Sequence, residues 1–385
     1  MSVFNQSERE LIIKTCSEKG TEEHLKTWQS VTDYLNMLLQ RNYKDSKTYR
    51  NVWNDHLIIV EGHEIKRDIQ KEKYKLSDIA REYRNDIRNQ ARIEVLTDRS
   101  VHAINTLPKI FLKPFKIVQS DTTALVNASD WHLGAKHENY WSRYSVDIAK
   151  ERIAYYAHEI IRYAKNYNVS EILILNLGDM IEGFIHVSTR IQSELDAIDQ
   201  SILAGELFSQ FIMKIRNTLR VPVKVGWVLD NHSRIHPNKK EHIESESLQR
   251  IVMEFTKLRL EKTDIEFVGN YIDNNIGHYN LNGKNIVWVH GHLDNPNTVL
   301  SKLQSGLPFK IDDVIIAHRH STLIKENVYQ VPSMKGTDEY AKDKRLFGNA
   351  AQSFRIYDGN NKITFEIIFD QEGTCLENEK NSKEN

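Results

Sequence analysis

The segment Glu171-Ile-Leu-Ile-Leu-Asn-Leu-Gly-Asp179 runs from a strand-sized apolar stretch into a turn that ends on a carboxylate. A helical pattern follows it at about residues 199–219. The same alternation occurs upstream, where strand-like Ala124-Leu-Val-Asn-Ala-Ser129 precedes an amphipathic segment at about residues 146–164. Strands that alternate with helices indicate an α/β layered domain.

The alternation continues towards the C-terminus. A further helix is predicted at about residues 244–260. The further strand-like segments lie at 223–229, 265–268, 286–289 and 314–317, with a closing hairpin at 353–369. We therefore predict one α/β domain over residues 120–371, followed by a disordered polar tail at 372–385.

Composition excludes several classes of protein. The 385 residues are 40% hydrophobic and 27% charged with a formal net charge of −1, which excludes wholesale disorder and a nucleic-acid binder that works by bulk positive charge. The longest apolar runs are strand-sized, so we expect no membrane partner. Cys16 and Cys375 are the only cysteines, which excludes a disulfide framework and a cysteine-ligated zinc site. The N-terminus lacks the pattern of a signal peptide, and we expect a cytoplasmic protein.

Residues 1–107 differ in composition from the rest. Proline is absent before Pro108 and only two glycines occur there, so this region is predicted to be mostly helical. Within it, residues 28–55 show a helical pattern, a polar turn and a second helical pattern, which is typical of a helix-turn-helix. Lys44, Lys47 and Arg50 give this part a small basic excess. It contacts DNA, or it is a helical hairpin that only packs, and the sequence leaves both open.

A long amphipathic helix is predicted over residues 64–95. Apolar residues recur there at steps of 3, 4 or 7, which places them on one stripe of a charged helix. The stripe consists of Ile65, Ile69, Leu76, Ile79, Tyr83 and Ile87. It is half of a coiled coil in a homodimer, or it packs on the following domain. The sequence leaves both open, and the first predicts a homodimer formed through the N-terminal helices.

Polar residues gather where the predicted strands end. Each of five strand ends carries a carboxylate, an imidazole or an amide. The residues are Asp130 and His132, Asp179, Asn231 and His232, His290 and His292, and His318 and His320. Because the carboxyl ends of strands in open α/β sheets line one crevice, we expect these side chains on one rim. Oxygen and imidazole ligands without thiolate suit Mn²⁺, Fe or Zn²⁺, and their number exceeds one tetrahedral site.

This ordered set of motifs resembles that of the calcineurin-like metallophosphoesterase superfamily. The pattern of that family is D-x-H, G-D, G-N-H-[D/E], H and G-H-x-H. The sequence carries, in the same order, Asp130-Trp-His132, Gly178-Asp179, Asn231-His232, His290 and His318-Arg-His320. Among members it looks most like the branch of DNA double-strand-break repair exonucleases and like phage-encoded members. The resemblance implies a layered α/β sandwich with helices outside.

The resemblance also implies a role for each matching residue. One divalent metal ion would be held by Asp130, His132 and His320, a second by Asn231, His290 and His318, and Asp179 would bridge both. Mn²⁺ is the expected metal, with Fe, Zn²⁺ or Mg²⁺ as alternatives. A hydroxide that bridges the metals would attack phosphorus, with His232 assisting the leaving group. Arg319, between two ligands, is a candidate for binding phosphate.

Three positions depart from the family pattern. Asp230 replaces a glycine, Ser233 replaces the acidic residue that often orients the catalytic histidine, and Ala317 replaces a glycine. We take Asp230 as a candidate to orient His232 in place of the missing acid. None of the departures removes a metal ligand.

Several nearby residues have more than one interpretation. Glu182 and His186 follow the predicted bridging aspartate, and they line the substrate groove or belong to a loop. Trp131 and Trp141 stack on a base, or they belong to the core. His292 is the alternative to the histidine two residues before it.

Three functions are open from the sequence. The first is a binuclear metal-dependent phosphodiesterase, an exonuclease-like DNA nuclease with a role in DNA repair and with DNA as its partner. The second is a phosphodiesterase or phosphatase on small nucleotides, because the loops around the rim select the substrate. The third is a non-catalytic scaffold that resembles a small subunit of some DNA polymerases, although every expected ligand is present.

Overall fold

The chain divides into two compact units, Met1–Ala91 and Arg92–Asn385, and each is described by itself. The residues described by the computed structural model are 3–108, 110–116, 118–185, 192–236, 238, 242–269 and 272–369. The predicted tail at 372–385 lies outside them. Within these residues, no helix is long and apolar enough to cross a membrane. The predicted α/β domain with a helical region before it is confirmed.

The N-terminal unit is built on helices α1 (Gln6–Ser17), α2 (Trp28–Leu38) and the start of α3 (Lys47–Thr106). The two short helices each begin at a capping box, in which the side chain of the capping residue bonds the backbone three residues on. Their apolar faces meet in a small core made of Phe4, Ile12, Cys16, Leu25, Val31, Leu35, Tyr49 and Val52.

A polar turn joins α2 to α3. The Asn36 side chain bonds both the N–H and the carbonyl of Tyr43, and its oxygen accepts a hydrogen bond from the Tyr49 hydroxyl at 3.0 Å. These bonds tie the turn to both helices. A helix, a turn and a helix therefore occupy the predicted residues 28–55.

Helix α3 covers 60 residues and is therefore longer than the helix predicted at 64–95. The predicted apolar stripe lies on α3, and Ile58 extends it by two turns towards the N-terminus. All of these side chains are exposed, with relative exposures of 49–67%. We call this row the seam, and it consists of Ile58, Ile65, Ile69, Leu76, Ile79, Tyr83 and Ile87.

The α/β unit contains two main sheets. The first has the strand order β13-β12-β1-β4-β5-β6. Its strands are β1 (Thr123–Ala128), β4 (Glu171–Asn176), β5 (Val223–Trp227), β6 (Glu266–Phe267), β12 (Ala351–Asp358) and β13 (Asn361–Ile368). Strands β1, β4, β5 and β6 are parallel, and β12 and β13 form the predicted closing hairpin.

The second sheet has the strand order β10-β11-β9-β8-β7. Its strands are β7 (Gly277–Leu281), β8 (Lys284–Val289), β9 (Asp313–Ile316), β10 (Leu323–Lys325) and β11 (Val328–Gln330). Strands β8 and β9 are parallel. The sequence did not predict β7, β10 and β11, because they are short and carry little apolar alternation. A small ribbon of β2 (His137–Glu138) and β3 (Arg143–Tyr144) lies apart from both sheets.

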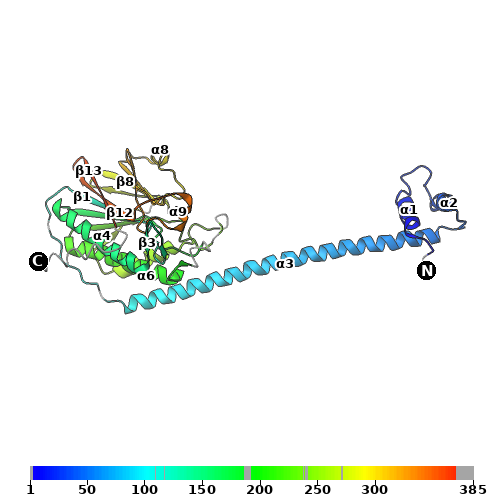
Figure 1. Ribbon diagram of the computed structural model, residues 1–385, viewed down its shortest axis with the longest axis horizontal. Helices are drawn as coiled ribbons and strands as arrows, with labels where there is room; N and C mark the ends of the chain where they lie inside the picture. The colour runs from blue at the N-terminus through cyan, green and yellow to red at the C-terminus, as the bar shows by residue number, and fades with distance from the viewer. Residues whose placement is uncertain are drawn as a thin grey trace. The chain divides into compact units, whose positions relative to one another are not determined.

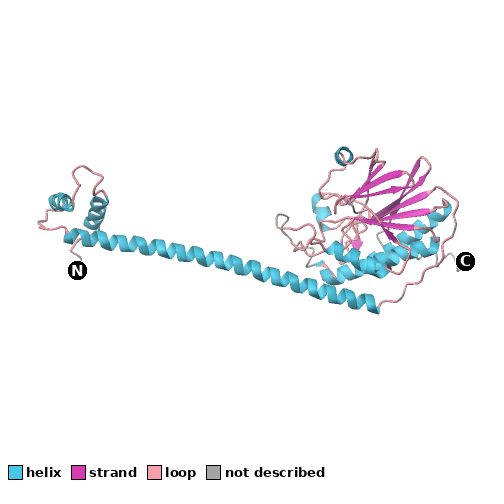
Figure 2. Cartoon of the chain, turned by 180° about the vertical axis from the view of Figure 1, so that it is seen from behind, coloured by secondary structure: helices cyan, strands magenta, loops and turns pink. Residues whose placement is uncertain are grey.

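Alternation along each strand decides which layer a side chain joins. In β4, Ile172 and Ile174 belong to a core shared with helices, whereas Leu173 and Leu175 belong to a core between the two sheets. The helices are α4 (Val146–Asn166), α6 (Ala197–Leu219) and α7 (Leu248–Leu260) against the first sheet, and α8 (Val299–Gly306) against the second. Figures 1 and 2 show the sheets lying between these helical layers, with helices outside as predicted.

Candidate metal centre

The strand ends of both sheets deliver polar residues to one rim. In the first sheet, residues 130–132 follow β1, residue 179 follows β4, and residues 231–232 follow β5. In the second sheet, residue 290 follows β8 and residues 318–320 follow β9. Five separate strands therefore position one cluster, and all of them contribute through their carboxyl ends.

Five of the predicted ligands have a left-handed backbone conformation. Their φ angles lie between 46° and 70°, and the residues are Asp130, His132, Asp179, His318 and His320. Residues other than glycine avoid this region because the side chain crowds the backbone there, and such strain collects at functional sites. The turns after β1, β4 and β9 thus hold these side chains on the rim at a cost in backbone energy.

The first ligand cluster consists of Asp130, His132, Asp179 and His320, whose ligand atoms all lie within 4.8 Å of one another. The Nε2 atoms of His132 and His320 are 3.2 Å apart, and His320 Nε2 is 3.2 Å from Asp130 Oδ1. His132 Nε2 lies 3.9 Å from Asp130 Oδ1 and 3.9 Å from Asp179 Oδ2. Imidazole nitrogens and carboxylate oxygens therefore converge on one point.

The second cluster consists of Asp179, His290 and His318. His290 Nε2 lies 3.3 Å from Asp179 Oδ2 and 2.9 Å from Asn231 Oδ1. The other ring nitrogen, Nδ1, lies 2.7 Å from the Leu177 carbonyl, to which it donates a hydrogen bond. In the neutral ring, Nε2 therefore turns its lone pair toward two oxygens. Asp179 belongs to both clusters and lies between them.

The chemistry of these groups fits divalent cations. Among the described residues, Asp130 Oδ1, Asp179 Oδ2 and His318 Nδ1 are buried ligand atoms without a hydrogen-bond partner. Buried polar atoms are nearly always paired, so each of these calls for a group that binds it. A cation in each cluster would satisfy all three, because Asp130 belongs to the first cluster, His318 to the second and Asp179 to both. Nitrogen and oxygen donors without sulfur suit Mn²⁺, Fe or Zn²⁺.

Charge and burial act on these groups in opposite directions. Burial would raise the pKa of Asp130, but His320 lowers it to about 2. Burial likewise acts to raise the pKa of Asp179, but His290 holds it well below its ordinary value. Burial would lower the pKa of His290, but the Asp179 carboxylate raises it to about 10. The buried carboxylates therefore stay ionised and attract positive charge, which a divalent cation supplies in place of a proton.

Asp230 holds the turns after β4 and β5 together. Its carboxylate accepts hydrogen bonds from the Asp179 N–H at 2.9 Å and from the N–H and hydroxyl of Ser233 at 2.7 and 3.0 Å. A Cβ on Gly178 would come within 2.5 Å of the Asp230 side chain, and the φ of +91° there also favours glycine. The sequence offered Asp230 as a candidate to orient His232, and in the structure its carboxylate bonds the backbone of Asp179 and Ser233.

His232 lies at the edge of the first cluster. Its Nδ1 is 2.8 Å from the Glu182 carbonyl, and its Nε2 is 4.0 Å from Asp179 Oδ2. The ring meets that of His132 edge-on, with centroids 4.6 Å apart. Burial would lower the pKa of His232, but Asp179 and Glu182 raise it above its ordinary value. The backbone of Glu182 thus holds the imidazole.

Glu182 and Lys335 form a buried charge network behind the first cluster. Glu182 Oε2 lies 2.9 Å from His132 Nδ1 and 3.3 Å from Lys335 Nζ. Lys335 Nζ lies 2.7 Å from Asp338 Oδ2. A carboxylate that accepts from the second nitrogen of a ligand histidine fixes its tautomer and turns Nε2 toward the metal. From the sequence, Glu182 was expected either to line the substrate groove or to belong to a loop. The sequence did not single out Lys335, because a lysine in a loop is ordinarily exposed.

The other predicted site residues have different surroundings. Arg319 is exposed. His292 is half-buried, and its ring centroid lies 5.4 Å from that of His290. Trp131 is buried in the core of the α/β unit, which favours the core interpretation for this residue. His186 lies outside the described residues.

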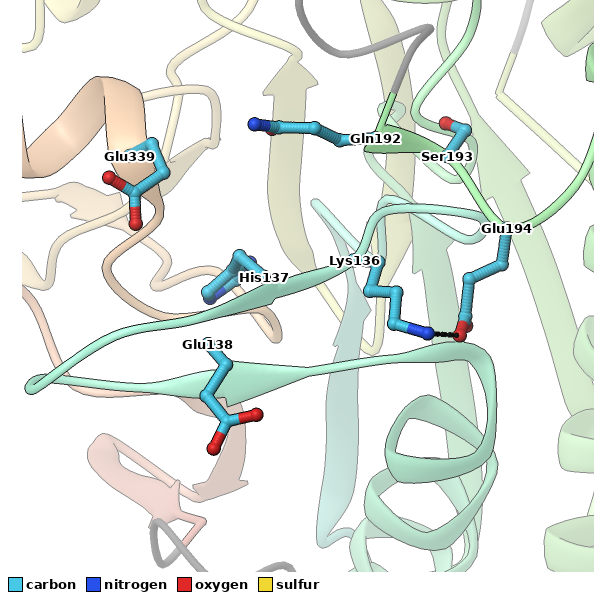
Figure 3. Close-up of a pocket in the computed structure, with 7 residues that line it drawn as sticks. All are labelled: Lys136, His137, Glu138, Gln192, Ser193, Glu194 and Glu339. Atoms are coloured by element: carbon cyan, nitrogen blue, oxygen red, sulfur yellow. Dashed lines mark ion pairs between the residues drawn. The ribbon is translucent and has the colours of Figure 1, made fainter.

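A pocket of about 480 Å³ is lined in part by β2 of the small ribbon. Its lining, drawn in Figure 3, consists of Lys136, His137, Glu138, Gln192, Ser193, Glu194 and Glu339. Lys136 Nζ lies 3.0 Å from a Glu194 carboxylate oxygen, and the Glu194 N–H donates to the Gly134 carbonyl at 2.8 Å. Because Gly134 is two residues after His132, the pocket wall is joined to the first cluster.

No protein-family model matches the chain. The SPbeta prophage-derived uncharacterized protein YonJ of Bacillus subtilis (strain 168) is 22% identical over 383 residues, which cover 91% of this chain and 93% of that protein.

The solved structures that resemble the chain include two with a sequence identity of 12% each. Vps29 from Chaetomium thermophilum gives a TM-score of 0.32 over 66% of this chain and 93% of that one. The calcineurin-like phosphoesterase YfkN from Bacillus subtilis gives 0.27 over 68% of this chain and 97% of that one.

Proposed function

We propose that this chain is a phosphodiesterase that holds two divalent cations and cleaves DNA. One observation carries the proposal: the Asp179 carboxylate is shared by two clusters of buried nitrogen and oxygen ligands. A carboxylate in that position suits a pair of cations, and paired cations are common catalysts of phosphodiester hydrolysis. Mn²⁺ suits the mixture of imidazole and oxygen donors.

The ligands divide between two cation sites. One site would use Asp130, His132 and His320, and the other Asn231, His290 and His318, with Asp179 between them. Cations bound there supply a Lewis acid for the phosphoryl oxygens and a water of lowered pKa. The chain supplies rigidity, because strands from two sheets fix the ligand positions before a substrate arrives.

His232 is suited to protonate the leaving oxygen. Because its Nδ1–H donates to the Glu182 carbonyl, the proton available for transfer lies on Nε2, on the side that faces Asp179. Burial opposes the charged ring, but the Asp179 and Glu182 carboxylates raise its pKa and favour the imidazolium. An acid held in this way transfers its proton to a departing alkoxide.

The N-terminal unit supports DNA as the substrate. Lys47, Arg50, Asn51 and Asn54 occupy exposed positions in the first two turns of α3, which is the second helix of the helix-turn-helix. Their spacing places them on one face of the helix. Arg and Asn side chains read guanine and adenine edges in the major groove, and Lys binds phosphate. Lys44, in the turn, is also exposed.

The pocket in Figure 3 favours a second candidate, the hydrolysis of a small nucleotide. Its volume of about 480 Å³ suits a nucleotide-sized ligand. The Gln192 amide and the Ser193 hydroxyl line it and offer hydrogen bonds to a base. The same metal centre would then act on a dinucleotide whose base enters this pocket.

Hydrolysis assays with and without Mn²⁺ distinguish these candidates. The substrates are labelled single- and double-stranded DNA, bis-p-nitrophenyl phosphate and a cyclic dinucleotide. We expect Mn²⁺-dependent cleavage of DNA and of the small diester, both lost in Asp179→Ala. Turnover of the cyclic dinucleotide with none of DNA would select the second candidate. If the purified chain contains no metal and hydrolyses none of these substrates with Mn²⁺ added, both candidate functions are excluded. The non-catalytic scaffold would then be the remaining function.

A further inference from the structure

Three aromatic side chains are exposed together in the α/β unit. Tyr140, Trp141 and Phe347 have relative exposures of 86%, 36% and 46%. The rings of Trp141 and Phe347 have centroids 4.9 Å apart and are tilted by 32°, and Tyr140 meets Trp141 edge-on at 5.5 Å. A gathered apolar surface of this kind marks an interaction site. We call these three residues the platform.

Hydrogen bonds join the two halves of the platform. Asn139 Nδ2 and Ser142 Oγ flank Tyr140 and Trp141 in the chain, and both donate to the Thr337 carbonyl at 3.0 Å. The Thr337 hydroxyl donates to the carbonyl of residue 348 at 3.0 Å and accepts from its N–H at 3.1 Å. The ribbon of β2 and β3 and the loop at 345–348 are therefore held together.

The platform borders the first ligand cluster. Gly348 packs on His320, since a Cβ on Gly348 would lie 3.1 Å from the His320 carbonyl oxygen. The His320 side chain is 25% exposed, so the cluster opens to solvent at this ligand. Phe347 is one residue from the contact, about 3.8 Å along the chain. A nucleotide with its phosphate at the metal centre therefore reaches the platform with its base.

We infer that the platform stacks on a nucleobase next to the scissile phosphate, and that the substrate is a single strand or a frayed strand end. The inference rests on the proposed function, because it places the phosphate at the metal centre. Base–aromatic stacking accepts every base and contributes about tenfold or more in affinity per base. A paired duplex hides the faces of its bases, so the platform selects unpaired nucleotides.

Trp141→Ala tests the inference on oligonucleotide substrates. We expect the KM for a single-stranded oligonucleotide to rise about tenfold while kcat is nearly unchanged. An oligonucleotide with an abasic nucleotide beside the cleaved bond should bind weakly already, and the substitution should weaken it no further. Tyr74→Ala, which removes an exposed ring from α3, is the matched control. An equal loss on both substrates, or no loss on either, would overturn the inference.

Binding without turnover separates this inference from the proposed function. A fluorescein-labelled single-stranded oligonucleotide is titrated with the Asp179→Ala chain, with and without Trp141→Ala. We expect the second substitution to weaken binding about tenfold. If the wild-type chain cleaves no DNA while binding depends on Trp141 and on the base, the nuclease proposal fails and the stacking stands. If binding is indifferent to Trp141, the stacking fails whatever is cleaved.

A separate observation, in the N-terminal unit, concerns the seam of α3. Between Ile58 and Tyr83, six of the eight a and d positions of a heptad pattern carry apolar side chains, and the other two are Gly62 at a and Glu72 at d. The apolar d positions are Ile58, Ile65 and Ile79, and the apolar a positions are Ile69, Leu76 and Tyr83. Helices gain most of their stability by packing an apolar face, and this face is exposed.

Charges beside the seam show which partner fits it. Glu61 and Asp68 occupy g positions, and Lys66 and Lys73 occupy e positions five residues after each of them. In a parallel pair, a g residue faces the e residue five positions on in the other helix, so Glu61 meets Lys66 and Asp68 meets Lys73. In an antiparallel pair, e positions face e positions and g positions face g positions, so Lys66 and Lys73 face lysines. Glu61 and Asp68 then face acids, unless the register sets Lys75, which is also a g residue, opposite one of them.

We further infer that two copies of this chain pair through the seam as a parallel coiled coil. A two-fold pair is self-complementary, because each copy offers both the acidic and the basic side. The parallel arrangement brings both helix-turn-helix segments to the same end of the coil. Two half-sites of a palindromic DNA sequence require such an arrangement.

Sedimentation of the full chain tests this pairing. We expect a dimer at micromolar concentration, converted to a monomer by Leu76→Glu and left intact by Leu258→Glu, which changes an exposed leucine of α7. Lys66→Glu with Lys73→Glu should weaken the dimer, and adding Glu61→Lys with Asp68→Lys should restore it. A wild-type monomer would overturn the pairing. Failure of the fourfold exchange to restore the dimer would overturn the parallel arrangement.

Discussion

The metal centre and the seam of α3 break the ordinary rule of burial in opposite ways. In the centre, polar ligand atoms of Asp130, Asp179 and His318 are buried without a hydrogen-bond partner. In the seam, large apolar side chains are exposed. Each exception indicates a missing partner, and the kind of atom involved indicates which partner it is. The lone pairs of the buried ligand atoms indicate a cation as the partner, and the apolar side chains of the seam indicate another apolar surface.

The two regions also differ in how many elements build them. Strands from two sheets position the metal centre, so its geometry depends on the whole α/β unit. A single helix positions the seam, so its geometry follows from the helix period alone. We therefore expect substitutions in the centre to have large and specific effects, and substitutions in α3 to have small and graded ones.

Asp179→Ala is expected to have the largest effect. It removes the one carboxylate shared by both clusters, so each cation site loses a ligand. We expect kcat/KM on a phosphodiester to fall by about a thousandfold or more. Elemental analysis should show two bound metals in the wild-type chain and less than one in the variant.

Asp147→Ala is the control for this substitution, because it removes an exposed carboxylate whose partner is Lys150 on the surface of α4. It should leave both activity and metal content unchanged. An Asp179→Ala chain that kept two metals would show that the carboxylate is not a bridge and that the two clusters are independent.

His232→Gln is expected to separate acid catalysis from metal binding. Its Nε2 lies 4.0 Å from Asp179 Oδ2, and its Nδ1 is held by the Glu182 carbonyl. We expect kcat to fall by about 10²- to 10⁴-fold while the bound metal stays at the wild-type level. Loss of metal from this variant would make His232 a ligand instead of an acid. Activity and metal content measured on the same preparation distinguish an acid from a metal ligand.

Lys335→Met is expected to destabilise the α/β unit. It leaves Glu182 and Asp338 without the ammonium between them, at a cost of about 3–5 kcal/mol at neutral pH. Burial would raise the pKa of both carboxyls, but Lys335 holds both well below their ordinary values. Their contribution to stability is thus present above the ordinary carboxyl pKa of about 4 and is lost as the pH falls below it.

Urea unfolding at pH 7 and pH 4 measures this effect. The difference in unfolding free energy between wild type and Lys335→Met should shrink at pH 4, where the unpaired carboxyls take up protons. A difference of the same size at both pH values would show that Lys335 acts through packing of its methylenes and not through charge.

The contrast between Asp179 and Lys335 shows how far sequence reading extends. Asp179 follows a strand and belongs to an ordered set of motifs, so local pattern alone placed it on the rim. Lys335 follows no pattern, and its partner Glu182 lies 153 residues away in the chain. Ion pairs between distant segments depend on how two sheets pack, and no local spacing encodes that. The partners of Asp230 likewise lie on two separate turns.

The seam shows the opposite limit. The sequence alone showed its helical period from Ile65 to Ile87. The charged residues beside it indicate a parallel orientation for a second copy of the helix. The sequence left open whether this face packs on the following domain. An apolar stripe indicates that another apolar surface covers it, but it does not identify that surface. Within the N-terminal unit, no described residue covers the stripe, whose side chains are exposed.

The smallest expected effect comes from Gly62→Ala in α3. Gly62 lies in the interior of the helix, and a Cβ added there meets nothing within 4 Å. Alanine favours the helix over glycine by about 0.5–1 kcal/mol, so amide hydrogen exchange around residue 62 should slow by about two- to fivefold.

Gly20→Ala is the matched control in the same unit. A Cβ at Gly20 also meets nothing within 4 Å, but the φ of +89° there disfavours any other residue. The two substitutions add the same methyl group to equally open space and should have opposite signs, with exchange near residue 20 becoming faster. If both slowed exchange, backbone conformation would not govern this region.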